Sequence, residues 1–362
     1  MFKIAQFTKY SSRAASARQR FSQYQPYLVE LGLKSENFSF FDDEYVSNLF
    51  MGRKFLSGNV IKCYLRRFKD IFKSKSFDAI VVQCEVFPYL ASFFDSLIRI
   101  YGAPIVFDYD DAIFHNYDMH RSFIVRALLA RKIDRIMAYC DLVMAGNAYL
   151  ADRARAAGAR RVEIIPTVVD VDAYQVRSPA PEGGIVRIGW IGTPGTWTTY
   201  MASMMPLLTD IACAHGARIM AVGAGPAAKP HPMLDNLAWT EETEVAHIQQ
   251  MDIGLMPLTD TPWSRGKCGY KLIQYMACGL PVIASPVGVN AKLVEHGVNG
   301  FLASTESQWR AALSMLLRDP ALRQRMGAEG RRKVEGEYSL QVYGPRVAQL
   351  LLDVARKGRG SR

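Results

Sequence analysis

The fold is decided by the stretch Ser264-Arg-Gly-Lys-Cys-Gly-Tyr-Lys-Leu-Ile-Gln-Tyr-Met-Ala-Cys-Gly-Leu-Pro-Val-Ile-Ala-Ser-Pro-Val-Gly288. Gly266 and Gly269 predict a loop that can close around a ligand, because glycine lets the backbone approach it. Residues 270–277 then predict a short helix, which Gly-Leu-Pro ends. A buried strand at 282–284 follows, so the stretch reads as loop, helix and strand of an α/β domain.

Three cations lie at the start of the predicted helix, namely Arg265, Lys267 and Lys271. The helix dipole already favours anions at that end, and charged donors bind phosphate oxygens well. The stretch therefore predicts a diphosphate site that includes Gly266 and Gly269. A solvated basic loop is the alternative interpretation.

Short apolar runs alternate with helical patterns along the whole chain, which is typical of a parallel sheet with helices on both faces. We predict strands in the first half at 3–7, 79–83, 105–108, 142–145 and 162–165. We predict strands in the second half at 186–191, 218–222, 253–257, 281–284 and 301–302.

The chain should form two doubly wound α/β domains, since 362 residues exceed the size of one ordinary core. The Pro- and Gly-rich residues 177–184 are the predicted linker. This gives a first domain at 1–176 and a second domain at 185–335. Residues 336–362 should form a helix that packs back towards the first domain and ends in a basic tail.

The first predicted strand of the second half runs into Gly192-Thr193-Pro-Gly195. Ligands of open α/β sheets lie at the carboxyl ends of strands, and a glycine turn before a helix favours a phosphate. Gly192 and Thr193 are therefore candidate phosphate-binding residues. Most such turns are simply tight turns, and that alternative stays open.

Composition and segment patterns narrow the protein class. No run approaches the roughly 18 apolar residues of a membrane span, and MFKIAQFTKYSSR has no secretory leader pattern. The six cysteines show no CxxC spacing, which favours reduced packing thiols. We therefore expect a cytoplasmic protein with no metal site.

Several motifs resemble retaining glycosyltransferase family 4, the group-1 glycosyltransferases, and in particular bacterial cell-surface polysaccharide glycosyltransferases. The block Met276-Ala-Cys-Gly-Leu-Pro-Val282 matches that family's donor-binding signature in full. Further segments resemble the family in the correct order, at 141–150, 165–170, 222–226 and 294–302. The resemblance covers roughly residues 140–340. It implies the GT-B fold, two Rossmann-like domains facing a central cleft. It also implies that residues 1–176 bind the acceptor and that residues 185–335 bind the nucleotide-sugar donor, with Gly192 and Thr193 at the donor site.

The departures from the family signature concern its two glutamates. Gly266 stands where the family has the Glu that holds donor-sugar hydroxyls, and Gln274 where it has the Glu usually on the donor ribose. Gln274 can still donate to and accept from ribose hydroxyls. Gly266 cannot replace a carboxylate. Thr193 replaces a family Arg, so phosphate charge should fall to the three cations.

Acidic residues follow two strands of the first half, Glu85 after one and Asp110 and Asp111 after another. Carboxylates at strand ends can act as a base for an acceptor hydroxyl or stabilise an oxocarbenium-like sugar. We take Asp110 or Asp111 as catalytic, with Glu85 as second choice. Helix capping is the alternative. Asp108-x-Asp110 also resembles a metal-binding motif, but we expect no metal.

Two basic segments of the first half suggest further partners. Arg13, Arg18 and Arg20 could meet an acceptor phosphate, or belong to an exposed helix start. Residues 53–75 carry eight basic residues against one acid, and 60–75 read as an amphipathic helix. We predict contact with an anionic membrane through Lys62, Arg66, Arg67, Lys69 and Lys73. Packing of the apolar stripe on its own sheet is the alternative.

The phosphate-site residues and the family resemblance together predict a glycosyltransferase that moves a sugar from a nucleotide-diphosphate donor to an acceptor. The resemblance implies a hexosyltransferase that needs no metal and retains the configuration of the sugar. It also implies that the acceptor is a lipid-linked glycan in cell-surface polysaccharide synthesis. We expect no cofactor beyond the donor substrate, no nucleic-acid partner, and a peripheral position on the inner face of the plasma membrane. A catalytically inactive GT-B-like partner protein is the alternative. A nicotinamide-dependent oxidoreductase is disfavoured, because the strand ending at Val222-Gly223 lacks the ribose-binding acid.

Overall fold

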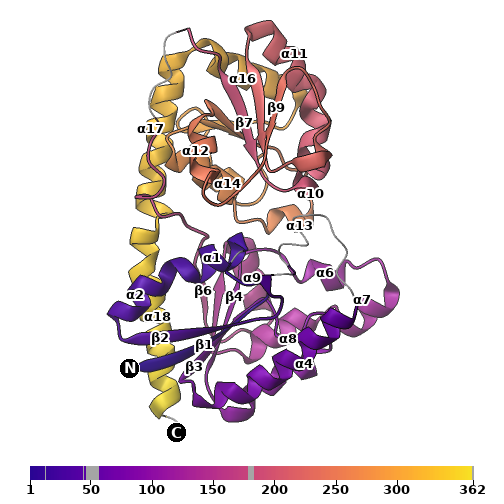
Figure 1. Cartoon of the computed structure of the whole chain (residues 1–362), viewed down its shortest axis with the longest axis vertical. Helices are drawn as coiled ribbons and strands as arrows, with labels where there is room; N and C mark the ends of the chain where they lie inside the picture. Colours follow the sequence, from indigo (N-terminus) through magenta and orange to yellow (C-terminus); the bar gives the residue numbers. More distant parts are fainter. Residues whose placement is uncertain (13, 44, 46–56, 178–182, 361–362) are drawn as a thin grey trace. The chain divides into compact units, whose positions relative to one another are not determined.

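The computed structural model describes residues 1–12, 14–43, 45, 57–177 and 183–360. These fall into two compact units. The first comprises Met1–Thr167, Gly266–Cys268 and Tyr343–Arg362, and the second Val168–Arg265 and Gly269–Val342. Figure 1 follows the chain through both by colour.

The first unit is built on a parallel six-stranded sheet of order β2-β1-β3-β4-β5-β6. Its strands are β1 (Phe2–Thr8), β2 (Leu33–Ser39), β3 (Ala79–Gln83), β4 (Ile105–Tyr109), β5 (Leu142–Ala145) and β6 (Val162–Ile164). The strand order reverses between β1 and β3, so the sheet is doubly wound.

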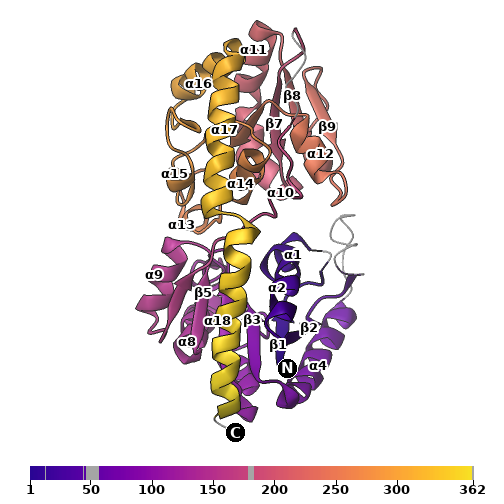
Figure 2. The same ribbon diagram turned by 90° about the vertical axis from the view of Figure 1, so that its left-hand side faces the viewer.

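Helices cover both faces of this sheet (Figures 1 and 2). They are α1 (Ala15–Arg20), α2 (Gln25–Glu30), α4 (Ser57–Lys73), α5 (Ser92–Ser96), α6 (His115–Asp118), α7 (Phe123–Leu129), α8 (Lys132–Tyr139), α9 (Ala148–Ala156) and, from Tyr343 on, α18 (Leu340–Gly360). In Figure 2, α18 lies alongside the sheet. Its contacts are close, because a Cβ added at Gly344 would lie 2.4 Å from the Tyr27 ring.

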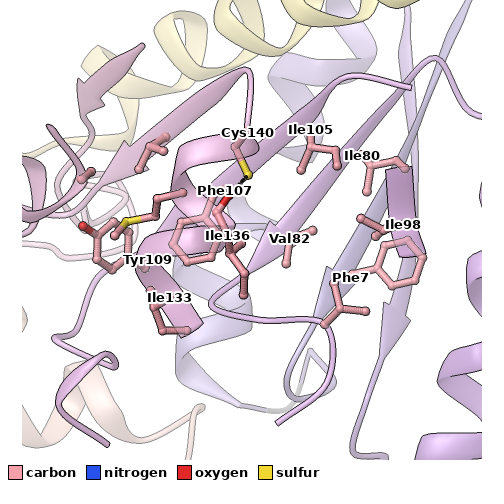
Figure 3. Packing of buried hydrophobic residues seen from close by; sticks show 14 of the residues in the cluster. Phe7, Ile80, Val82, Ile98, Ile105, Phe107, Tyr109, Ile133, Ile136 and Cys140 are labelled. Atoms are coloured by element: carbon pink, nitrogen blue, oxygen red, sulfur yellow. Dashed lines mark hydrogen bonds between the residues drawn. The ribbon is translucent and has the colours of Figure 1, made fainter. Parts of the chain in front are cut away.

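Apolar side chains from the central strands and from α8 form the core of the first unit (Figure 3). Phe107 and Tyr109 on β4 place their ring centroids 5.2 Å apart. Ile133 and Ile136 of α8 are fully covered in the same cluster. β3 and β4 are buried along their whole lengths, which is expected of strands that helices cover on both faces.

The second unit also has a parallel six-stranded sheet, of order β12-β11-β10-β7-β8-β9. Its strands are β7 (Arg187–Ile191), β8 (Arg218–Val222), β9 (Leu234–Leu237), β10 (Ile253–Met256), β11 (Val282–Ala284) and β12 (Gly300–Leu302). Numbered within the unit, this is the doubly wound order 3-2-1-4-5-6 read from the β9 edge. The switch point lies between β7 and β10.

Successive residues of β7 point into two different cores. Ile188 and Trp190 belong to one cluster, and Ile191 to the other. The helices of this unit are α10 (Pro194–Thr196), α11 (Met205–His215), α12 (Glu244–Gln249), α13 (Pro262–Arg265), α14 (Tyr270–Ala277), α15 (Asn290–Leu293), α16 (Glu306–Arg318) and α17 (Pro320–Glu337). Residues of α11 and α16 fill the first cluster and residues of α14 the second, so both faces are covered.

The sheets contain the ten predicted strands, with ends shifted by at most one residue, and two more. The two additional strands, β2 and β9, lie at sheet edges and are only partly buried. Both strands contain several polar residues, so neither is an apolar run in the sequence.

The boundary between the units also differs from the expected one. The second unit begins at Val168, nine residues before the expected linker. Arg177, the first linker residue, donates its backbone N–H to the Cys278 carbonyl (3.0 Å) and pairs with Asp252 (2.7 Å). Residues 178–182 lie outside the described part of the chain. The expected C-terminal helix is present, and Tyr343–Arg362 group with the first unit.

Gly327 on α17 offers a test of this packing. A Cβ there would lie 1.9 Å from the Gly279 carbonyl oxygen, whereas one at Gly336 on the same helix meets nothing within 4 Å. We expect Gly327→Ala to destabilise the protein by about 1–3 kcal/mol, because backbone must move. Gly336→Ala should stabilise it by up to about 1 kcal/mol through helix propensity. Equal melting temperatures for the two variants would contradict this packing.

Candidate functional site

Helix α14 is seated across the switch point of the second sheet by Tyr275. The buried Tyr275 hydroxyl accepts the backbone N–H of Ile191 on β7 at 2.9 Å. Its ring fills the space beside Gly254 on β10, where a Cβ would lie 2.4 Å from ring atoms. The N-terminus of α14 is thereby held beside the carboxyl ends of β7 and β10, where ligands of such sheets bind.

Lys271 of α14 reaches the glycine turn that follows β7. Its Nζ lies 4.5 Å from the ring centroid of Trp190, and a Cβ at Gly192 would lie 2.7 Å from that nitrogen. A Cβ at Gly223, after β8, would lie 2.3 Å from the Gly192 carbonyl oxygen. Two glycine turns and an ammonium group therefore meet at one edge, an arrangement suited to a phosphate.

Gly269 is a predicted donor-binding residue, and in the structure its position has no room for a side chain. It precedes α14 with φ near +71°, a conformation that favours glycine. A Cβ there would also lie 2.4 Å from Leu293 Cδ1. Thr193 caps α10: its backbone N–H donates to the Thr196 hydroxyl at 3.0 Å.

The three predicted cations have different surroundings. Arg265 is exposed and pairs with Asp260, Nε to Oδ1 at 2.7 Å, and this hydrogen bond lowers the pKa of Asp260. Lys267 belongs to the first unit. Lys271 lies at the Gly192 turn. A diphosphate site that all three cations share stays a prediction.

Gln274, predicted to bind ribose, is buried and already hydrogen-bonded. Its Nε2 donates to Glu244 Oε1 at 2.7 Å and to the Tyr174 hydroxyl at 2.8 Å. Sequence reasoning missed Glu244, because it lies thirty residues upstream of Gln274 and only folding joins them.

Gly266 and Lys267 pack on the first unit beside the acids after β4. Asn147, another residue that sequence reasoning missed, donates its Nδ2 to the Gly266 carbonyl (3.0 Å) and the Lys267 carbonyl (3.1 Å). A Cβ at Gly266 would lie 2.4 Å from Ala112 Cβ. No side chain fits at 266 without a shift, which accounts for glycine in place of the family glutamate.

Asp110 and Asp111 lie together in this part of the first unit. Burial, and then Asp110, raise the pKa of Asp111 to about 6, while Lys267 acts in the opposite direction. Asp110 accepts a hydrogen bond from the Thr167 hydroxyl at 3.2 Å. Both carboxylates are partly exposed and neither caps a described helix. The structure therefore groups the two predicted acids with Lys267.

Arg20 and Asp108 form a buried ion pair. Arg20 Nε donates to Asp108 Oδ2 at 3.1 Å, and its Nη1 donates to the Ile165 carbonyl at 2.8 Å. The prediction that Arg20 binds acceptor is wrong, because its guanidinium is enclosed and fully engaged. Arg18 is half-buried on the same helix, and Arg13 lies outside the described residues.

Glu85, the second-choice catalytic acid, is also a buried structural group. Lys132 Nζ lies 2.5 Å from Glu85 Oε2, and the Tyr117 hydroxyl donates to the same oxygen at 2.6 Å. Lys132 also lies 3.4 Å from Asp95 Oδ2. With its carboxylate held by two donors, Glu85 does not meet the expectation of a free acid.

The predicted basic helix is α4, and its charges divide between two environments. Arg67 is buried and donates to the Phe38 and Thr8 carbonyls at 2.8 and 2.6 Å, so it is corrected from a membrane residue to a structural one. Arg66 donates to the Phe40 carbonyl at 2.7 Å. Exposed positions are held by Lys62, Lys69 and Lys73, and by the apolar Ile61, Leu65 and Phe72.

The described residues contain neither a membrane-spanning helix nor a cluster of metal ligands. None of the helices traced there is both long and apolar enough to cross a membrane. Among the same residues, no group of three or more His, Cys, Asp or Glu side chains is arranged to hold a metal ion.

Residues 185–319 match the family model described as "Glycosyl transferases group 1". The chain therefore contains a group 1 glycosyltransferase domain. This domain covers the whole second sheet, α14 and the Gly192 turn. Two proteins of Bacillus subtilis (strain 168) are similar to parts of the chain.

Spore coat protein SA is 36% identical over 87 residues, which are 23% of this chain and 22% of that protein. The putative teichuronic acid biosynthesis glycosyltransferase TuaH is 24% identical over 178 residues, 44% of each chain. The chain thus spans less than half the length of the curated relatives that it matches.

Solved structures resemble the whole chain and establish the GT-B fold. Sucrose-phosphate synthase from Thermosynechococcus elongatus superposes with a TM-score of 0.70 at 14% identity, covering 98% of this chain and 99% of that one. Anabaena HepE in complex with UDP and glucose gives 0.69 at 15% identity, covering 97% and 99%. At these identities the likeness shows the fold alone.

The raised pKa of Asp111 has a measurable consequence for stability. An unfolded Asp titrates near pH 4. Between about pH 4 and 6 the folded chain holds a proton that the unfolded chain has released, so the contribution of Asp111 to stability falls as pH rises. We expect the melting temperature of Asp111→Asn, relative to the parent, to rise between pH 4 and 7.

The matched control is Asp152→Asn on α9, whose side chain is 74% exposed. Its melting temperature should follow the parent at every pH in differential scanning fluorimetry. Parallel profiles for Asp111→Asn and the parent would show that Asp111 titrates normally.

Proposed function

We propose that the protein is a glycosyltransferase that transfers a sugar from a nucleoside-diphosphate donor to a glycan acceptor. The observation that carries this proposal is the position of Lys271 at the Gly192 turn, at the switch point of a group 1 glycosyltransferase domain. The complex of HepE with UDP-glucose, on the same fold, supports a donor of the nucleoside-diphosphate class.

The second unit holds the donor in this proposal. Backbone N–H groups of the glycine turns and the Lys271 ammonium offset the charge of the diphosphate, which grows as the sugar–phosphate bond breaks. In other enzymes a divalent metal ion stabilises the negative charge of a leaving diphosphate. Because Lys271 and the backbone N–H groups supply positive charge at this position, we propose transfer without a metal. The donor sugar is a hexose in this reading, and its configuration is retained.

The first unit supplies the acids. We propose that Asp110 and Asp111 orient or deprotonate the acceptor hydroxyl, with Lys267 holding Asp111 in place. Burial that raises the pKa of Asp111 to about 6 brings it close to the range in which a general base works well. Glu85 is left out, because Lys132 and Tyr117 already bind it.

We propose a cell-surface polysaccharide, lipid-linked during synthesis, as the acceptor. Similarity to a putative teichuronic acid biosynthesis glycosyltransferase supports this class. We also propose that the protein is cytoplasmic and binds to the inner face of the plasma membrane, and the exposed face of α4 supports this. There Ile61, Leu65 and Phe72 are 59–64% exposed beside lysines, a composition suited to anionic headgroups.

The donor site is tested by Lys271→Ala. Loss of a charge-assisted contact should weaken nucleoside-diphosphate binding by roughly 1.5–3 kcal/mol in calorimetry. Arg325→Ala, on the exposed face of α17, is the control and should bind as the parent does. Unchanged affinity in Lys271→Ala would reject the phosphate assignment. Tight donor binding by the parent without transfer or hydrolysis would instead indicate a catalytically inactive partner protein.

The membrane proposal is tested by reversing Lys62 and Lys69 to Glu. Electrostatic attraction to an anionic surface contributes about 1 kcal/mol per basic residue. The double variant should therefore no longer co-sediment with phosphatidylglycerol vesicles. The control reverses Lys229 and Arg325, two exposed cations of the second unit, with the same change in net charge. Equal loss of binding in both double variants would show attraction by net charge alone.

A further inference from the structure

Glu244 is the centre of a hydrogen-bonded cluster in the second unit. It opens α12, and its Oε1 accepts from the Tyr174 hydroxyl at 2.6 Å and from Gln274 Nε2 at 2.7 Å. Its Oε2 accepts from Trp239 Nε1 at 2.7 Å. Three donors from different parts of the chain therefore fix one carboxylate.

Each group that bonds to the Glu244 carboxylate is a hydrogen-bond donor. Gln274 is 3% exposed and donates both N–H bonds of its amide, one to Glu244 and one to Tyr174. A glutamate at 274 would bring a second carboxylate within 3 Å of the first, where like charges repel. The amide at 274 therefore supplies a donor to Glu244 and avoids a second acid in this cluster.

Glu244 also stands near the place where a doubly wound sheet binds a ribose. In such sheets an acidic residue at the end of the second strand accepts from ribose hydroxyls. The second strand here is β8, which ends in Val222-Gly223 with no acid. A Cβ at Gly223 would lie 3.1 Å from Trp239 Cβ, and Trp239 Nε1 donates to Glu244, so one indole side chain links the Glu244 carboxylate to this end of the sheet.

Glu244 keeps acceptor capacity for a ligand. An ionised carboxylate offers about four lone-pair positions, and the three donors occupy three of them. The residue is half-buried rather than enclosed. Because two donors bond to Oε1 and one bonds to Oε2, the fourth acceptor position lies on Oε2.

We propose that Glu244 is the ribose-binding residue of the nucleotide site, and that Gln274, Tyr174 and Trp239 position it. The inference rests on the proposed function, because it names the group that receives the nucleoside of the donor. In this proposal the ribose-binding acid lies on α12. Gln274 does not contact the ribose but holds Glu244 in position through its hydrogen bond.

The test compares nucleotides with and without ribose hydroxyls. UDP, GDP and ADP, each paired with its 2′,3′-dideoxy counterpart, are titrated into the parent protein by calorimetry. We expect the tightest of the three to lose about tenfold or more in affinity without its hydroxyls, since a charge-assisted contact is lost. In Glu244→Gln this ratio should fall to about threefold or less.

Three variants separate the possible explanations. Glu241→Gln removes the same charge from a neighbouring exposed position and should keep the parent ratio. Lys271→Ala should weaken the ribose and dideoxy forms alike, leaving the ratio unchanged. Trp239→Phe keeps an aromatic ring but removes a donor to Glu244, so it should lower the ratio only in part.

A parent-like ratio in a folded Glu244→Gln overturns the ribose assignment and leaves the phosphate site intact. A reduced ratio there, together with no effect of Lys271→Ala, supports the ribose assignment and rejects the phosphate assignment. Absence of binding of all three nucleotides to the parent overturns both. Melting temperatures of the variants within a few degrees of the parent establish that each is folded.

Discussion

The seating of Tyr275 between β7 and β10 is the contact on which the candidate donor site depends. Its ring occupies the space that a side chain at Gly254 would need, and its hydroxyl accepts from Ile191. Helix α14 can adopt no other height above the sheet without losing a buried hydrogen bond, which is costly. The packing of α14 therefore determines that Lys271 lies at the Gly192 turn.

The first unit uses charge differently. Arg20 with Asp108, and Lys132 with Glu85 and Asp95, are ion pairs enclosed in the fold. Such pairs contribute little net stability, but removing one partner leaves an uncompensated charge and costs about 3–5 kcal/mol. They neutralise Asp108, near the end of β4, and Glu85, just after β3. Asp110 and Asp111, which follow β4 directly, are half-buried and belong to neither of these ion pairs.

The departures from the glycosyltransferase signature have physical explanations. Gly266 is required where the chain passes Ala112, so a glutamate there would need backbone to move. Gln274 lies within hydrogen-bonding distance of Glu244, so an amide relieves the repulsion that a second carboxylate would bring. Both replacements follow from neighbours that are distant in sequence. The signature is altered where the local environment of this chain differs.

The sequence by itself determined the features that repeat locally. Apolar runs located ten of the twelve strands that the described residues form, and the glycine and proline pattern located α14 with its flanking turns. Edge strands β2 and β9 escaped, because half-exposed strands carry polar residues like those of loops.

The tertiary structure alone decided which charged side chains meet. Arg20 and Arg67 look solvent-exposed in sequence, yet both are buried and bonded to backbone carbonyls that are distant in sequence. Residues from Val168 on join the second unit through contacts with segments a hundred or more residues away, such as Tyr174 with Gln274. Burial and pairing are long-range properties, and local periodicity carries no information about the partner. For the same reason Glu244 could be recognised only after folding placed it beside Gln274 and Trp239.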